Sequence, residues 1–130
     1  MKYAYPAVFT KEDVGYSVIF PDIPNCFTSG TDLPEAIEMA QDVLNLMLMT
    51  MEDKGIPISP ASELTSCPHE DGEFVSLVSA DTVEYRKKYG DYAVKKTLSI
   101  PAWLNTLAER DGINFSATLQ KALKEALDLS

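Results

Sequence analysis

Residues 93–104 read AVKKTLSIPAWL, and they join a strand pattern to the start of a helix. Side chains alternate between two faces up to Ile100, as they do in a β-strand. The polar face consists of Lys95, Thr97 and Ser99. The other face consists of Val94, Lys96, Leu98 and Ile100. Pro101 cannot continue a strand ladder but suits the first turn of a helix, so we predict a strand over 93–100 followed directly by a helix.

Two short amphipathic helices are expected after this strand. In the first, Trp103, Leu104 and Leu107 recur at helical spacing. Gly112 ends this helix, because glycine adopts the left-handed conformation freely, and Asn114 is suited to cap the second helix. The apolar stripe of the second helix consists of Phe115, Leu119, Ala122, Leu123, Ala126 and Leu127.

This C-terminal unit requires a second chain. A unit of about 38 residues is too small to bury its apolar stripes alone, and a lone strand leaves an unpaired edge. Pairing with the same strand of a second copy, about a twofold axis, removes both problems. The resulting ribbon exposes Lys95, Thr97 and Ser99, and such a ribbon fits the major groove of DNA. The start of the second helix, at Asn114, Phe115 and Ser116, offers N–H groups to a DNA phosphate.

The N-terminal part predicts an α+β domain with an antiparallel sheet. Alternating patterns indicate strands over 3–10 and 16–20. A short third strand is expected over 26–29, beyond the kink at Pro21 and Pro24, and a further strand over 74–78. A long helix is expected between Leu33 and Gly55, with Asp32 and Glu35 forming a capping box. Its unusually wide apolar arc indicates either deep burial under the sheet or contact with another chain.

The charge is unevenly distributed along the 130 residues, whose net charge is −9. Residues 1–92 carry 16 acidic and 6 basic side chains, a net of −10, whereas 93–130 carry 4 acidic and 5 basic, a net of +1. An acidic N-terminal part suits a basic partner, but it repels the phosphates of DNA. The C-terminal part, with its net charge of +1, does not repel phosphate in this way. Without a signal peptide or a run long enough to span a bilayer, the chain is expected in the cytoplasm and away from membranes.

Two motifs carry a family resemblance. The first runs from Lys96 to Leu104 and continues over 112–116, and it resembles the C-terminal ribbon-helix-helix domain of HicB-type antitoxins. The second, over 15–36, contains Phe20-Pro21-Asp22-Ile23-Pro24-Asn25-Cys26-Phe27-Thr28 and resembles the N-terminal domain of that family. Asn25 stands where the family pattern often has glycine, and a left-handed asparagine can fill that position.

The resemblance implies a function for each part. Residues 1–81 would form a partial RNase H-like domain that masks a small, basic, RNA-cleaving HicA-type toxin. Residues 82–92, as a short helix or an extended linker, would connect it to a ribbon-helix-helix domain over 93–130 that binds operator double-stranded DNA and represses the operon. A homodimer through the C-terminal domain is expected, and a tetramer through the N-terminal domains is left open.

Candidate contact residues follow for both partners. For DNA they are Lys95, Thr97, Ser99, Asn114, Phe115 and Ser116, with Lys95 contributing most because Thr97 and Ser99 are short. For the toxin we expect the stretch from Asp22 to Thr28, because two prolines hold an otherwise exposed polar loop rigid. Its candidate residues are Asp22, Ile23, Asn25, Phe27 and Thr28.

Catalysis and cofactor binding are not expected. Asp13, Asp22, Asp32 and Glu35 could suggest a metal-dependent nuclease, but Glu35 is better used in the helix cap. Cys67-Pro68-His69 with a distant Cys26 lacks the paired spacing of a zinc site, and a single histidine leaves no triad. The alternative function is a ligand-sensing ribbon-helix-helix repressor without a toxin partner, for which no convergent ligand set is evident.

Overall fold

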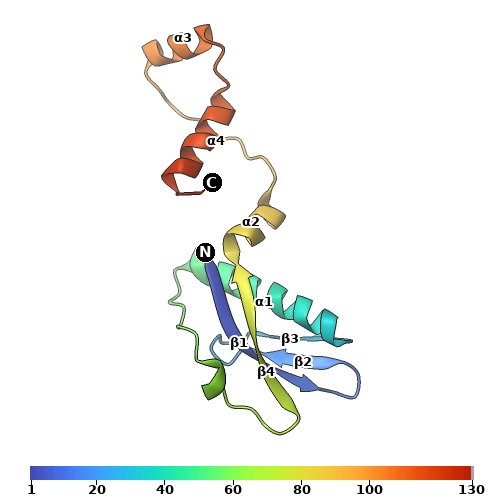
Figure 1. Ribbon diagram of the computed structural model, residues 1–130. Helices are drawn as coiled ribbons and strands as arrows, with labels where there is room; N and C mark the ends of the chain where they lie inside the picture. The colour runs from blue at the N-terminus through green and yellow to red at the C-terminus, as the bar shows by residue number, and fades with distance from the viewer. Residues whose placement is uncertain (130) are drawn as a thin grey trace. The chain divides into compact units, whose positions relative to one another are not determined.

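The computed structural model describes residues 1–129. The chain divides into two compact units, the first over Met1–Tyr92 and the second beginning at Ala93. Figure 1 shows the sheet and the long helix α1 in the first unit and the helices α3 and α4 in the second. Residues 82–92 belong to the first unit. Among residues 1–129, no helix combines the length and the apolar character that crossing a membrane requires.

The first unit is built on a four-stranded antiparallel sheet with the order β3-β2-β1-β4. The strands are β1 (Lys2–Lys11), β2 (Tyr16–Ile19), β3 (Phe27–Gly30) and β4 (Glu73–Asp81). The predicted α+β arrangement with an antiparallel sheet and one long helix is therefore confirmed. The strand β4 is longer than its predicted core, because all nine of its residues pair with β1.

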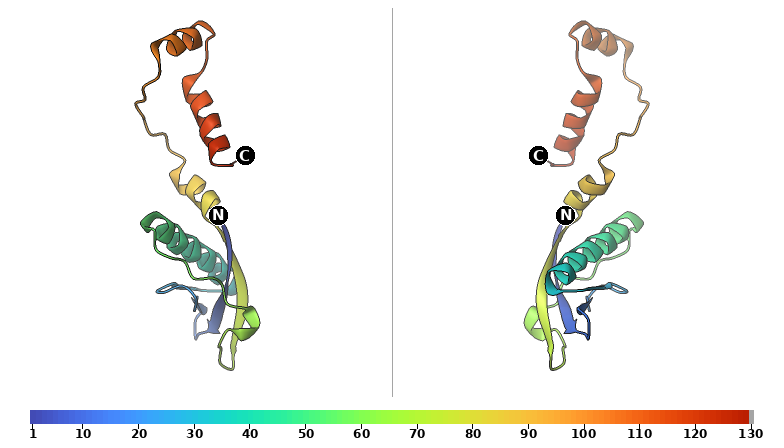
Figure 2. Two further views of the ribbon diagram at one scale, coloured as in Figure 1. Left: turned by 90° about the vertical axis from the view of Figure 1, so that its left-hand side faces the viewer. Right: turned by 90° about the vertical axis from the view of Figure 1, so that its right-hand side faces the viewer.

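The helix α1 (Leu33–Lys54) covers one face of this sheet, as the two views of Figure 2 show. It begins as predicted, since Asp32 Oδ1 accepts from the Glu35 N–H at 2.8 Å, and the Glu35 carboxylate accepts from the Thr31 N–H. It ends at Gly55, whose φ of 67° is left-handed. The buried side chains between the helix and the sheet are Tyr5, Ala7, Phe9, Val18, Val78, Ala80, Ala36, Ala40, Leu44 and Leu48.

Two glycines let the chain pass closely where β3 meets α1. A Cβ on Gly30 would overlap the backbone nitrogen of Ala36 and lie 2.6 Å from its Cα. A Cβ on Gly15, in the β1–β2 turn, would overlap the carbonyl oxygen of Gly30. Backbone atoms cannot move aside as a flexible side chain can, so a larger residue does not fit at either position. Glycine at both positions lets the edge of the sheet pack closely against the start of α1.

The segment 82–92 contains a short helix, α2 (Thr82–Gly90), which packs on α1. Glu52 of α1 holds it in place by accepting hydrogen bonds from the Thr82 hydroxyl at 3.0 Å and from Arg86 at 3.1 Å. Arg86 also pairs with Asp53 at 2.8 Å. Of the two alternatives for residues 82–92, the structure therefore shows the short helix, which Arg86 binds to α1.

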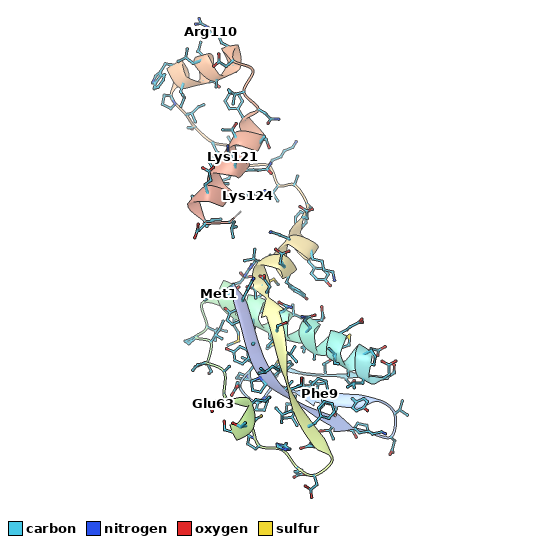
Figure 3. All side chains as sticks on the ribbon, viewed as in Figure 1. Met1, Phe9, Glu63, Arg110, Lys121 and Lys124 are labelled. Atoms are coloured by element: carbon cyan, nitrogen blue, oxygen red, sulfur yellow. The ribbon has the colours of Figure 1, made fainter. Side chains whose placement is uncertain are left out.

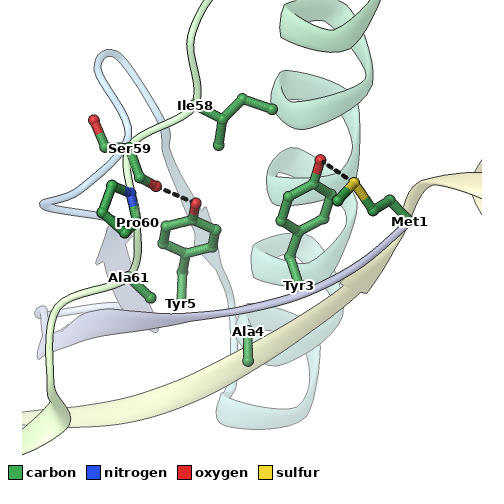
Figure 4. A pocket seen from close by; sticks show the side chains of 8 residues that line it. All are labelled: Met1, Tyr3, Ala4, Tyr5, Ile58, Ser59, Pro60 and Ala61. Atoms are coloured by element: carbon green, nitrogen blue, oxygen red, sulfur yellow. Dashed lines mark hydrogen bonds between the residues drawn. The ribbon is translucent and has the colours of Figure 1, made fainter.

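The long connection from Gly55 to β4 is anchored to the rest of the unit at several points. The Tyr5 hydroxyl donates to the Ser59 carbonyl, as Figure 4 shows beside Ile58, Pro60 and Ala61. Asp22 accepts from the Ser62 N–H at 2.8 Å and from the Ser62 hydroxyl at 2.6 Å. A single 3-10 turn, η1 (Leu64–Ser66), precedes Cys67, which is buried and carries a free thiol.

The second unit consists of α3 (Ala102–Arg110) and α4 (Phe115–Ala126), preceded by residues 93–101. Gly112, with φ of 65°, ends α3 as predicted, and Asn114 caps α4 by accepting from the Ala117 N–H at 3.0 Å. Residues 93–101 form no strand within the single chain. Among its described residues this unit has no fully buried side chain, so its apolar stripes are open to solvent.

Candidate functional site

Within residues 1–129, the polar ribbon residues predicted to contact DNA make no side-chain hydrogen bond or ion pair. Lys95, Thr97 and Ser99 are exposed, and so are the neighbouring apolar residues. Val94 is 78% exposed, Leu98 53% and Ile100 48%. A strand needs ladder partners for its backbone groups, and the described residues of the single chain supply none to residues 93–100. Pairing of residues 93–100 from two chains into a ribbon therefore remains a prediction about the dimer.

The start of α4 brings the other three predicted DNA contacts together. Asn114 is the N-cap, and Phe115 and Ser116 occupy the first turn, all three being exposed. N–H groups in a first turn have no acceptor inside the helix, and the helix dipole makes this end partly positive. The Asn114 side chain satisfies one of these groups, at Ala117. The N–H groups of Phe115 and Ser116 point along the helix axis and suit an anionic ligand such as a phosphate.

The second unit carries the basic side chains that an interaction with phosphates requires. Figure 3 shows Arg110 at the end of α3 and Lys121 and Lys124 on α4, all of them exposed. Together with Lys95 and Lys96 they account for every cation of this unit. The acidic side chains of the chain lie mostly in the first unit, as the charge count indicates.

The candidate toxin-binding residues do not lie on one surface. Ile23 is 2% exposed and belongs to the core, so its prediction as a partner contact is wrong for the folded chain. The hydrogen bond from the Ile23 N–H to the Phe20 carbonyl turns this apolar side chain inward. Asp22 is half-buried and is held by Ser62. Asn25 is exposed, with the expected left-handed φ of 57°.

The last two candidates of this group lie on opposite faces of β3. Thr28 pairs with Val18, whose side chain is buried under α1. Phe27 pairs with Ile19, which in turn pairs with Val8, and this row lies on the face away from α1. Phe27 is 65% exposed and Ile19 51%. The exposed apolar pair Phe27 and Ile19, like the exposed Asn25, can be reached by a partner without unfolding this region.

Three of the four carboxylates considered for metal catalysis make hydrogen bonds elsewhere, and the fourth, Asp13, is exposed in the β1–β2 turn. Asp32 and Glu35 form the cap of α1, and Asp22 binds Ser62. Within residues 1–129, no three His, Cys, Asp or Glu side chains are grouped closely enough to hold a metal ion. Burial raises the pKa of the Cys26 thiol to about 11 and also raises the pKa of Cys67, so both favour the unreactive protonated form.

One polar groove was not anticipated from the sequence. It lies between α1 and α2, has a volume of about 620 Å³, and is lined by side chains from both helices. Glu38, Asp42 and Asn45 follow each other at intervals of four and three residues, which places them on one face of α1. That spacing is a signal within the predicted helix. The groove was not predicted, because the facing element α2 was expected only as a short helix or an extended linker and nothing in its sequence indicated that it packs on α1.

The two units define a class of protein in which an acidic sheet-and-helix unit precedes a small helical unit whose apolar stripes are exposed in the single chain. The family described as HicB_like antitoxin of bacterial toxin-antitoxin system matches residues 5–123. The chain therefore belongs to the HicB-like antitoxin family.

Relatives and solved structures agree with this assignment. An antitoxin HicB 2 from Photorhabdus laumondii is 48% identical over 40 residues, which are 31% of this chain and 29% of that protein. An uncharacterized 14.9 kDa protein of Haemophilus phage HP1 is 30% identical over 103 residues, or 77% of this chain and 74% of that one. A chain of a toxin-antitoxin complex from Streptococcus pneumoniae is 28% identical with a TM-score of 0.64, covering 97% of this chain and 99% of that chain.

Proposed function

We propose that this antitoxin neutralises a HicA-type toxin by covering its active site with the first unit, and represses its operon by binding operator DNA as a dimer through the second. The observation that carries the DNA-binding half is the exposure of the apolar stripes in the second unit. Trp103 is 66% exposed, Leu107 50% and Leu123 50%. Fully burying an exposed leucine stabilises a protein by about 1.5–3 kcal/mol, so each half-exposed leucine forfeits roughly half of that amount.

A twofold dimer supports the proposal because it satisfies both the side chains and the backbone. The α4 helices bury their stripes against the second copy, and residues 93–100 of the two chains pair as an antiparallel ribbon. Alternation then directs Leu98 and Ile100 to the helices and Thr97 and Ser99 to the solvent side. The ribbon enters the major groove, while Phe115 and Ser116 contact the flanking phosphates.

The charge separation supports the toxin half of the proposal. The first unit has a net charge of −10, and a small basic ribonuclease would be attracted to it. Asn25 and Phe27 are the exposed members of the predicted contact loop, so they are the candidates that a toxin can touch. The partial RNase H-like character of this unit and its use as a shield for the toxin remain parts of the proposal.

Ribbon variants test the DNA-binding half separately from the toxin half. Lys95→Ala and Thr97→Ala should each weaken binding to the DNA upstream of the operon by about tenfold or more, since a lost base contact costs about 1–3 kcal/mol. Both variants should neutralise the toxin as well as the wild type does, because the substitutions lie outside the first unit. The measurement is a binding titration at one fixed salt concentration, with Glu70→Gln in the first unit as the control. Equal operator affinity for the ribbon variants and the wild type would contradict the ribbon assignment.

A further inference from the structure

The groove between α1 and α2 has the chemistry of a cation-binding site. Two rows of polar side chains line it, one from each helix, and each row repeats at helical intervals. From α1 come Glu38, Gln41, Asp42 and Asn45. From α2 and its N-cap come Asp81, Glu84, Tyr85 and Lys88. Four carboxylates and one ammonium group face this space, so the groove has a net charge of −3.

The carboxylates of α1 are the ones available to a ligand. Asp81 caps α2 by accepting from the Val83 and Glu84 N–H groups, and Glu84 pairs with Lys87 at 3.0 Å. Within residues 1–129, by contrast, neither Glu38 nor Asp42 has a cationic side chain within 4 Å. Asp42 accepts a hydrogen bond from the Tyr85 hydroxyl at 3.3 Å, which positions its carboxylate and leaves its other oxygen free.

A second observation at the same place points to a ligand. Asn45 lines the groove and is only 8% exposed. Its Nδ2 donates to the Gln41 carbonyl at 3.1 Å, but its Oδ1 has no partner and is the one buried side-chain polar atom left unsatisfied in the described residues. Leaving a buried acceptor without a donor costs about 1–3 kcal/mol. A donor that enters the groove, with a small movement of the lining side chains, would recover part of this cost.

We propose that the α1–α2 groove receives an arginine side chain of the basic protein that this antitoxin binds. A guanidinium group carries several donors in one plane, so it can bind the Asp42 and Glu38 carboxylates and donate to Asn45 Oδ1 together. A metal ion fits less well, because no three ligating side chains within residues 1–129 converge. This proposal rests on the proposed function, since the basic protein in question is the toxin, and it adds a contact surface to Asn25 and Phe27.

The groove and the exposed pair Phe27 and Ile19 lie on different elements, so substitutions can separate them. Glu38→Gln and Asp42→Asn, combined, remove two negative charges while keeping the size of both side chains and the acceptor for Tyr85. Glu70→Gln with Asp71→Asn removes the same charge from an exposed loop and serves as the matched control. Asn45→Leu removes the unpartnered oxygen, and thermal unfolding of every variant verifies that the fold is retained.

The first arm of the experiment uses the blocked tripeptide Gly-Arg-Gly as the probe and nuclear magnetic resonance of the full chain as the readout. Shifts should be confined to α1, α2 and the Asn45 side-chain amide, and the citrulline counterpart should produce none. The groove double variant should bind the peptide about tenfold or more weakly, as expected for the loss of a hydrogen bond to a charged group. Shifts spread over all acidic surfaces, or equal binding by the double variant, would overturn the site.

The second arm measures binding of a non-cleaving HicA-type toxin to the same proteins. The groove double variant should lose about tenfold or more in affinity, whereas the loop control should lose much less. If the wild type fails to bind the toxin while the tripeptide still binds in the groove, the proposed function fails and the cation site stands. If the double variant binds the toxin as tightly as the wild type does, the assignment of this groove to the toxin is wrong.

Discussion

Gly30 has no side chain, and this lets strand β3 pack closely against the start of α1. Its Cα faces the backbone of Ala36 at the start of α1, and no rotamer change can make room there. We predict that Gly30→Ala lowers the free energy of unfolding of the first unit by about 2–4 kcal/mol, through overlap with backbone atoms. Urea unfolding followed by the near-ultraviolet circular dichroism of tyrosine measures this, because all six tyrosines lie in the first unit.

Gly90→Ala is the matched control for this prediction. Gly90 is the last residue of α2, and a Cβ added there meets no atom within 4 Å. Alanine is the better helix former, so this variant should be neutral or slightly more stable. If both glycine variants had the same stability as the wild type, the close approach between β3 and α1 would not be a feature of the folded protein in solution.

Sequence reasoning at the residue scale succeeded where the cause is local. The Asp32 and Asn114 caps follow from the polar residue that precedes each helix, whereas the left-handed backbone of Asn25 was expected from the family resemblance. Ile23 was misjudged, because its polar neighbours suggested an exposed loop. Whether one apolar side chain turns inward depends on the cover provided by distant elements, and this information is absent from a short window.

At the element scale, the attachment of α2 depends on Glu52. Burial alone would raise the pKa of this carboxyl, but hydrogen bonds from Tyr3, Arg86 and Thr82 and the charge of Arg86 lower the pKa below its ordinary value of 4.5. A lowered pKa in the folded state means that Glu52 stabilises the fold fully above pH 4.5. The contribution is lost as the pH falls through the lower folded value.

The prediction is that Glu52→Gln destabilises the first unit at pH 7 and that this difference shrinks as the solution is acidified below pH 4.5. Glutamine keeps the size of the side chain but lacks the charge that Arg86 pairs with. Urea unfolding of the variant and the wild type at pH 7, 4.5 and 3 measures the difference. A gap of constant size at all three pH values would show that the charge of Glu52 is not what holds α2.

The order of elements was largely predictable, whereas their arrangement was not. Alternation identified the strands, and helical spacing with capping residues identified α1, α3 and α4. The pairing of β4 with β1 joins segments separated by a helix and a long loop, and no local pattern encodes that choice. For the same reason the groove between α1 and α2 was missed, since it exists only once the Glu52 contacts bring the two helices together.

At the scale of the whole molecule, a substitution in the apolar stripe of the second unit should have a different effect on a monomer and on a dimer. Leu123 is 50% exposed in the single chain, so Leu123→Ser should be nearly harmless to a monomer. In the proposed dimer the same substitution removes a buried leucine, which costs about 2 kcal/mol or more per site. We predict that Leu123→Ser shifts the molar mass in solution from dimer toward monomer at micromolar concentration, as measured by light scattering.

Lys121→Ser introduces the same residue on the opposite side of α4 and should leave the molar mass unchanged. Trp103 is the only tryptophan and lies in α3, so its fluorescence reports on this unit alone. In the wild type the tryptophan transition should move to higher temperature as the protein concentration rises. A concentration-independent transition, with identical masses for both serine variants, would show that another arrangement covers the apolar stripes.

The exposure of the apolar stripes of α3 and α4 in the single chain has a consequence for how repression depends on the antitoxin concentration. A binding unit that is completed only by another copy of itself is assembled in proportion to the square of the antitoxin level when that level is low. A twofold dilution then lowers the concentration of assembled repressor to about one quarter, by mass action. Repression would thus fade faster than the antitoxin itself as a cell divides or degrades it, and the operon would resume transcription before the supply is exhausted.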